Sequence, residues 1–268
     1  MTFPSWKKSF VTGIIGSIVA GAALLAQAVP SPLGMNPTAA QSNLLDSLTQ
    51  GNLVTGGAAR AFIALPTAAR VAVVHDGLAW ARAYVDSAAF KSAYDKRREN
   101  QKPEAPSFTG TVDDELKAKQ DEQKKQLAQS RTMLASLPAD QRASLEAVFK
   151  QTEAQMSDPA YVAMVRQSIE IDRARAQKEY QSSLADWQRD YPADPKILVA
   201  RRLQAFMALS ATVDFAAKTE GTGTGKTFVN PDYQQKSGDW KMCYRAGKES
   251  VDAARAAVTE WLKVLPKP

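Results

Sequence analysis

Apolar side chains recur three and four residues apart along most of this chain, and that spacing constrains the fold more than any other feature. One such stripe runs from Thr67 to about Arg98, and the clearest runs from Trp240 to Leu265. An α-helix gathers positions with this spacing on one face, which is then buried against another element. The stripes therefore predict an all-α fold, a bundle of about six amphipathic helices.

Prolines and capping residues mark where the predicted helices begin and end. Small polar residues that cap open backbone N–H groups, and prolines in the first turn, are typical of helix starts. The helices that follow the first one are expected from Thr111 to about Leu137, from Pro138 to about Met156, from Asp158 to about Tyr191, and from Asp194 for about 23 residues. Loops are expected at Asn100–Gly110 and at residues 220–238, with a short extended piece at Thr227–Val229.

The first 28 residues have the layout of a secretory signal peptide. Lys7 and Lys8 precede an apolar run over residues 10–26, and the run ends in Ala26-Gln27-Ala28. A basic head, an apolar middle and a small-x-small exit are the parts of such a signal. We therefore expect export to the periplasm or the exterior, with cleavage after Ala28. The alternative is an uncleaved anchor in which residues 10–26 stay in the membrane, although about 20 apolar residues are usual for a span.

The rest of the chain divides into two expected parts. Residues 29–66 are rich in Pro, Gly, Ser, Thr and Asn, and we expect a flexible lead-in with one short helical candidate near Ala39–Gln50. Residues 67–268 are expected to form a single helical domain, interrupted by the loop at 220–238.

Charge and cysteine content exclude several classes of function. The formal charge is +6, and removal of Lys7 and Lys8 would leave about +4, with acids and bases interspersed. This distribution is typical of a solvated helical surface, so we expect no nucleic-acid partner. Cys243 is the only cysteine, which leaves no intrachain disulfide. We expect a buried, inert thiol, with intermolecular pairing or a redox role as alternatives.

No motif in the chain assigns a reaction. Residues 220–227 resemble a phosphate-binding P-loop, but Glu220 stands where that motif needs glycine, and Pro231 prevents the helix that must follow. We interpret the segment as a flexible loop. Asp113, Asp114 and Glu115 are explained by helix capping rather than by a cation site. We expect no cofactor, no metal site and no catalytic residue, and a non-enzymatic role over an enzymatic one.

Six side chains are candidates for a pocket or for the core. His75 is the only histidine, and we expect it to be partly buried and hydrogen-bonded, with a lone general base or an axial haem ligand as alternatives. Five aromatic residues on the helical stripes either fill the core or line an inter-helix pocket. They are Trp187, Tyr191, Trp240, Tyr244 and Trp261.

The polar helix expected from Thr111 is a candidate interaction face. Its lysines Lys117, Lys119, Lys124 and Lys125 are predicted to be exposed to a protein partner or to solvent alone. Just beyond it, Leu137-Pro-Ala-Asp-Gln-Arg-Ala-Ser-Leu145 resembles the Leu-Thr-x-x-Gln helix start of small periplasmic stress chaperones of the Spy and CpxP type, over nine residues and with Pro138 in place of threonine. The resemblance implies a helical surface that binds unfolded clients without ATP.

Two classes of function stay open at this point. The first is a non-enzymatic, exported binding or structural protein of the cell envelope. The lack of catalytic motifs favours this class. The second is a small-ligand-binding protein or an enzyme with a pocket between helices, the place where helical bundles commonly hold ligands. The oligomeric state does not follow from the sequence.

Overall fold

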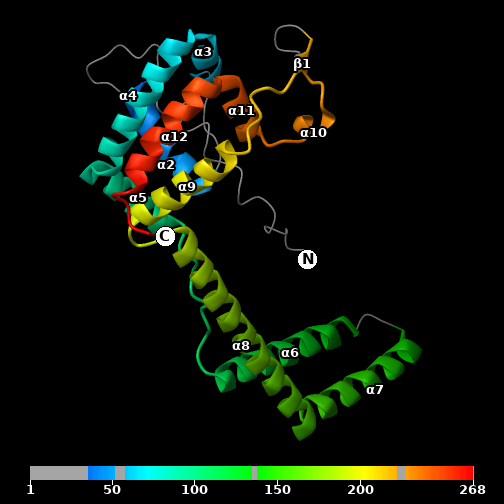
Figure 1. Cartoon of the computed structure of the whole chain (residues 1–268). Coiled ribbons are helices and arrows are strands. Elements are labelled where there is room, and N and C mark those ends of the chain that lie inside the picture. Colours follow the sequence, from blue (N-terminus) through cyan, green and yellow to red (C-terminus); the bar gives the residue numbers. More distant parts are fainter. Residues whose placement is uncertain (1–35, 52–57, 135–137, 222–226, 268) are drawn as a thin grey trace. The chain divides into compact units, whose positions relative to one another are not determined.

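The computed structural model describes residues 36–51, 58–134, 138–221 and 227–267, and these residues are almost wholly helical (Figure 1). They form eleven helices and one hairpin of two very short strands. The predicted all-α fold is confirmed, with more and shorter helices than expected. The expected signal or anchor at 1–28 lies outside the described residues. Within the described residues, every helix is too short or too polar to span a bilayer.

The chain forms two compact units, where the sequence predicted one helical domain over 67–268. Unit 1 contains the described residues up to 101 and from 187 onward, and unit 2 contains residues 102–186. The helices of unit 1 are α2 (Pro37–Gln50), α3 (Ala58–Ala64), α4 (Thr67–Val85), α5 (Ala88–Asn100), α9 (Pro195–Ser210), α10 (Pro231–Gln234), α11 (Gly238–Ala246) and α12 (Lys248–Leu262). Unit 2 contains α6 (Val112–Leu134), α7 (Ala139–Met156) and most of α8 (Pro159–Asp190), whose last four residues belong to unit 1.

The core of unit 1 is built around α4 and α12, which share the most extensive helix–helix interface (Figure 1). Val74 on α4 and Val251, Ala254 and Val258 on α12 are fully buried there. These positions follow the three-and-four spacing seen in the sequence, so the buried stripes are the ones expected. α9 packs against α12 and contributes Phe206 to the same core.

Residues 29–66 are not a flexible lead-in where the structure describes them. α2 is capped by Asn36, whose side chain accepts a hydrogen bond from Thr38 N (2.8 Å). Its Leu44, Leu45 and Leu48 are buried in the core of unit 1, as is Phe62 of α3. The apolar residues of this segment are few, but they lie about one helical turn apart. They therefore form a single face that packs against the other helices of unit 1.

Two helices expected to be continuous are each broken once. The stripe from Thr67 to Arg98 contains α4 and α5, separated at Ser87, whose Oγ accepts from Phe90 N (3.1 Å) and caps α5. The stripe from Trp240 contains α11 and α12, separated at Gly247, which has φ +89°. Residues with a Cβ atom rarely adopt this backbone conformation, so glycine permits the break.

The segment between α9 and α11 is held by an aromatic cluster. α9 ends at Ser210, earlier than predicted, and strands β1 (Thr219–Glu220) and β2 (Thr227–Phe228) pair antiparallel. The predicted extended piece is therefore present, but most of the P-loop-like segment, residues 222–226, lies outside the described residues. Phe228, Tyr233, Trp240 and Tyr244 stack or meet edge to face, with centroids 4.8–6.0 Å apart.

Unit 2 is a set of polar helices joined by ion pairs and caps rather than by a large core. Thr111 and Asp114 cap α6 reciprocally: Thr111 N donates to the Asp114 carboxylate (2.8 Å) and Asp114 N donates to Thr111 Oγ1 (3.2 Å). The Thr111 hydroxyl also donates to the Asp114 carboxylate (2.8 Å). The two hydrogen bonds that this carboxylate accepts, from the Thr111 backbone N–H and from the Thr111 hydroxyl, lower the pKa of Asp114. Arg131 binds both carboxylate oxygens of Glu153, which joins α6 to α7.

Candidate functional site

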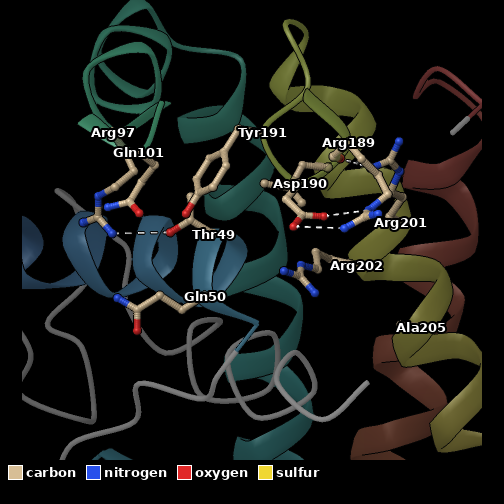
Figure 2. A pocket seen from close by; sticks show the side chains of 11 residues that line it. Thr49, Gln50, Arg97, Gln101, Arg189, Asp190, Tyr191, Arg201, Arg202 and Ala205 are labelled. Atoms are coloured by element: carbon tan, nitrogen blue, oxygen red, sulfur yellow. Dashed lines mark hydrogen bonds and ion pairs between the residues drawn. The ribbon is translucent and has the colours of Figure 1, made fainter. Parts of the chain in front are cut away.

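A cavity of about 890 Å³ lies within unit 1 and is the strongest candidate for a functional site (Figure 2). The ends of three helices, α2, α5 and α8, surround it, and α9 forms the facing wall. Its volume falls within the roughly 300–1,000 Å³ usual for small-molecule sites. The lining residues are Thr49, Gln50, Arg97, Gln101, Arg189, Asp190, Tyr191, Leu198, Arg201, Arg202 and Ala205.

Capping residues fix where α2 ends and where α9 begins, and these two helices form part of the cavity lining. α2 ends at Gly51, which adopts the left-handed conformation with φ +71° and donates its N–H to Ser47 O. α9 begins at Asp194, whose carboxylate accepts from Lys196 N (2.9 Å), with Pro195 in the first turn. Leu198, Arg201, Arg202 and Ala205 then follow at helical spacing, so one face of α9 turns toward the cavity.

Arg97 joins α5 to α2 at one edge of the cavity. Its guanidinium pairs with Asp46 (2.6 Å) and lies 3.5 Å from Thr49 Oγ1 (Figure 2). Both partners of the ion pair are largely withdrawn from solvent. The charge of Arg97 is therefore compensated by Asp46.

Arg189 and Asp190 form a second compensated pair. Arg189 Nε donates to Asp190 Oδ1 (2.9 Å), and the neighbouring terminal nitrogen donates to Oδ2 (3.4 Å). Arg201 donates to the backbone carbonyl of Arg189 near the end of α8. Cations are favourable at helix C-termini because the last carbonyls carry partial negative charge.

Arg202 reaches across the cavity from α9 to the end of α2. Its Nε donates to Leu48 O (2.9 Å), one of the carbonyls that the helix itself leaves open. A Cβ atom at Gly51 would stand 3.0 Å from the Arg202 terminal nitrogen, so glycine leaves room for the guanidinium. Burial lowers the pKa of Arg202, the charge of Arg201 acts in the same direction, and that of Asp190 opposes it.

The cavity carries an excess of positive charge. Among the residues that the structure describes, neither Arg201 nor Arg202 forms an ion pair with a carboxylate. Each uses a single nitrogen for a backbone carbonyl, although a guanidinium offers five N–H donors. Arg201 and Arg202 therefore retain unused donors. The four arginines that line the cavity, set against Asp46 and Asp190, leave an excess of about two positive charges.

Tyr191 and two aliphatic side chains supply the less polar part of the lining. Burial raises the pKa of Tyr191, and the charge of Asp190 raises it too, against the opposing charges of Arg97 and Arg202. Its hydroxyl therefore stays protonated at neutral pH. Leu198 is buried in the core behind the wall, and Ala205 is partly buried beside it.

The six candidate side chains from the sequence do not converge on this cavity. Only Tyr191 lines it. Trp187 is buried, with Nε1 donating to Arg98 O (2.9 Å) and the Arg98 guanidinium 4.0 Å from its ring. Trp240 and Trp261 are buried and Tyr244 is half-buried. Of the two roles considered for these side chains, the three tryptophans fill the core and Tyr191 lines the cavity.

His75 is exposed on α4 and belongs to neither the core nor the cavity. The expectation of a partly buried histidine is therefore wrong. Val74 and Leu78 point into the core, and the helical repeat turns His75 about 100° away from Val74.

Cys243 is fully buried. Burial, followed by the charge of Asp239, raises the pKa of its thiol. An inert thiol is what this environment favours.

The lysines of the predicted interaction face are all exposed on α6. They do not share one face. Lys119 lies two residues after Lys117, which is more than half a helical turn, whereas Lys124 returns close to the direction of Lys117. The four lysines therefore surround the helix and do not form a compact docking patch.

The acidic start of α6 is accounted for without a cation. Asp114 caps the helix, Glu115 pairs with Arg173 (3.0 Å) and Asp113 pairs with Arg166. The described residues contain no group of three or more His, Cys, Asp or Glu side chains arranged to hold a metal ion.

Sequence reasoning missed the arginines of the cavity because they come from three separate segments. The one available signal was the pair Arg201-Arg202 within an otherwise apolar stretch of α9. An amphipathic helix usually places its charges opposite its apolar stripe. Arg202 instead extends beside that stripe, toward the α2 end.

Comparisons with protein-family models, with curated proteins and with solved structures found no significant match to this chain.

Proposed function

We propose that this chain is an exported, non-enzymatic binding protein whose unit 1 cavity receives a small ligand. One observation carries the proposal: an 890 Å³ cavity lined by unused polar donors opens in an otherwise well-packed helical unit. The volume of this open cavity is within the range of small-molecule sites, so it has room for a ligand. Export rests on the signal-like residues 1–28.

The chemistry of the lining favours binding over catalysis. General acid–base catalysis needs a group that exchanges a proton near the working pH. Arginine stays charged in proteins, and the raised pKa of Tyr191 keeps its hydroxyl protonated. The Asp190 carboxylate is bound by Arg189. These groups hold and orient a ligand but supply no proton-transfer step.

Native mass spectrometry of the protein purified from its own host under mild conditions tests the proposal. We expect a bound small molecule that is lost when Gln50, at the edge of the cavity, is replaced by tryptophan. Gln204→Trp is the matched control, because Gln204 is exposed on α9 and does not line the cavity. Protein that carries no ligand, or ligand retained equally by Gln50→Trp, would contradict the proposal.

A chaperone-like role for unit 2 is a second candidate, favoured by a different observation. Among the residues that the structure describes, eight large apolar side chains are exposed, and six of them lie in unit 2: Phe108, Met133, Leu145, Val148, Met164 and Ile171. Exposed apolar side chains bind other apolar surfaces. The Spy- and CpxP-like helix start at Leu137–Leu145 suggests the same role.

Suppression of aggregation of reduced α-lactalbumin tests this second candidate. We expect the protein to suppress aggregation, and the double variant Met133→Ser, Met164→Ser to lose most of that effect. Val229→Ser with Val264→Ser removes two equally exposed apolar side chains from unit 1 and is the control. Equal activity of both double variants would argue against a role for unit 2.

A further inference from the structure

The unit 1 cavity contains two arginines that form no ion pair with any carboxylate in the described part of the chain, and the resulting excess of positive charge indicates the chemistry of its ligand. Arg97 is balanced by Asp46, and Arg189 is balanced by Asp190. Arg201 and Arg202 remain as neighbours on α9, and their backbone acceptors lie at the C-terminal ends of α8 and α2. The charge of Arg201 lowers the pKa of Arg202, so an anion near both guanidinium groups would be favourable.

We propose that the cavity binds the phosphate group of an organic phosphate through Arg201 and Arg202. The inference rests on the proposed function, since it names the ligand class of the same cavity. A phosphate monoester carries −1.5 to −2 charges at pH 7, which is about the excess left by the two arginines. A single carboxylate supplies only half of that charge.

Donor geometry supports the same ligand. A guanidinium is a planar fork that binds two oxygens of one phosphate, and the three phosphate oxygens offer enough acceptors for two such forks. Within the part of the chain that the structure describes, Arg202 uses only its Nε for a hydrogen bond, which leaves both terminal nitrogens for the ligand. The side-chain amides of Gln50 and Gln101 add neutral donors around the same space (Figure 2).

The size of the cavity indicates that the phosphate belongs to a larger molecule. A volume of about 890 Å³ is far more than one phosphate group fills. The Tyr191 ring, Leu198 and Ala205 provide apolar surface next to the arginines. A soluble phosphate ester and a phosphomonoester lipid headgroup share this chemistry.

Isothermal titration calorimetry on the full chain tests the inference with defined probes. We expect glycerol 3-phosphate to bind, inorganic phosphate to bind more weakly, and glycerol not to bind. Vesicles of phosphatidylcholine with phosphatidic acid, compared with phosphatidylcholine alone, separate the lipid source from the soluble one. A preference for either source supports the shared phosphate chemistry, and tighter binding of succinate than of glycerol 3-phosphate would overturn it.

Arg201→Gln should weaken the phosphate probe that binds by about tenfold or more, because a charge-assisted hydrogen bond is lost. Arg245→Gln removes the same charge from an exposed position outside the cavity and should leave binding unchanged. Arg202→Lys keeps the charge but removes the fork, and should also weaken binding. Circular dichroism of each variant confirms folding before the titration.

The outcomes separate this inference from the proposed function. If no phosphate probe binds but a copurified ligand is displaced by Gln50→Trp, the cavity binds a ligand of another class and only the phosphate inference fails. If phosphate binds equally to Arg201→Gln and to the intact protein, the binding site lies elsewhere and the inference is wrong. If neither a copurified ligand nor a phosphate probe binds, both fail.

Discussion

At the scale of single residues, Gly51 links backbone conformation to the cavity. Its φ of +71° is readily adopted by glycine, and its missing side chain leaves space for Arg202. The left-handed conformation costs other residues roughly 1–2 kcal/mol. The same residue therefore ends α2 and makes room for a charged group of the candidate site.

Gly51→Ala should lower the free energy of unfolding by about 1–2 kcal/mol, from the backbone conformation and the crowding of Arg202. Gly238→Ala is the matched control, because a Cβ atom there meets nothing within 4 Å and its φ is not positive. Urea unfolding of both variants measures the difference. Equal stability of the two variants would refute this account of Gly51.

Asp239 is a buried carboxyl whose second oxygen has no hydrogen-bond partner. Burial raises its pKa to about 6. The folded state therefore binds a proton more readily than the unfolded state, whose Asp titrates near its ordinary value of 3.8. By linkage, this residue makes the protein most stable below that value and less stable as the pH rises toward 6.

Asp239→Asn should remove that pH dependence and stabilise the fold at pH 7 by on the order of 1 kcal/mol, because a neutral amide avoids the burial penalty of the ionised carboxylate. Thermal melts between pH 4 and pH 7 measure it. Asp232→Asn, at an exposed first-turn position of α10, serves as the control. An unchanged pH profile in Asp239→Asn would show that this carboxyl titrates normally.

At the scale of elements, helix breaks depend on single capping groups. The Ser87 hydroxyl caps both helix ends at the break between α4 and α5. Its Oγ donates to Tyr84 O at the end of α4 (2.6 Å) and accepts from Phe90 N at the start of α5 (3.1 Å). The apolar stripe continues through the break, because Phe90 and Tyr94 are buried in the same core as Tyr84. Periodicity alone therefore predicted one helix where the structure has two.

Ser87→Ala should cost about 1 kcal/mol, the usual loss for a removed N-cap. Ser92→Ala, on the exposed side of α5, should be neutral or slightly stabilising because alanine is the better helix former. Chemical denaturation of the two variants compares them. A loss at Ser92 as large as that at Ser87 would contradict the capping explanation.

At the scale of the whole molecule, the two units differ in how they are stabilised. Unit 1 has a contiguous core of buried side chains from α2, α3, α4, α5, α9, α11 and α12. Among the described residues of unit 2, the buried apolar side chains are Leu116, Leu134 and Ile169. Its helices depend more on caps and on ion pairs with exposed partners, which contribute little each.

Hydrogen exchange should therefore be faster in unit 2 than in unit 1. Local opening costs least where few apolar contacts are broken, so we expect amides of α6 and α7 to exchange at least tenfold faster than those of α4 and α12. Native-state exchange read by mass spectrometry measures both sets in one sample. Similar protection across the four helices would mean that the ion pairs stabilise unit 2 as well as a core does.

The helical fold and many of its boundaries were predictable because they depend on neighbours in the sequence. Asp158 and Asp194 cap helices where expected, since a cap needs only a side chain and the next few N–H groups. Tyr191 was the one predicted side chain found at the cavity. Segments with few apolar residues, such as α2, were underestimated because their burial depends on partners far away in the chain.

By itself, the sequence determined that the chain is helical and where its helices are capped, because periodicity and capping are local. Only the tertiary structure decided that there are two units and that Arg97, Arg201 and Arg202 meet around one cavity. The arginines lie on helices separated by about a hundred residues, and no local pattern encodes which charges remain without a carboxylate. That balance is a property of packing, and the proposed ligand chemistry depends on it.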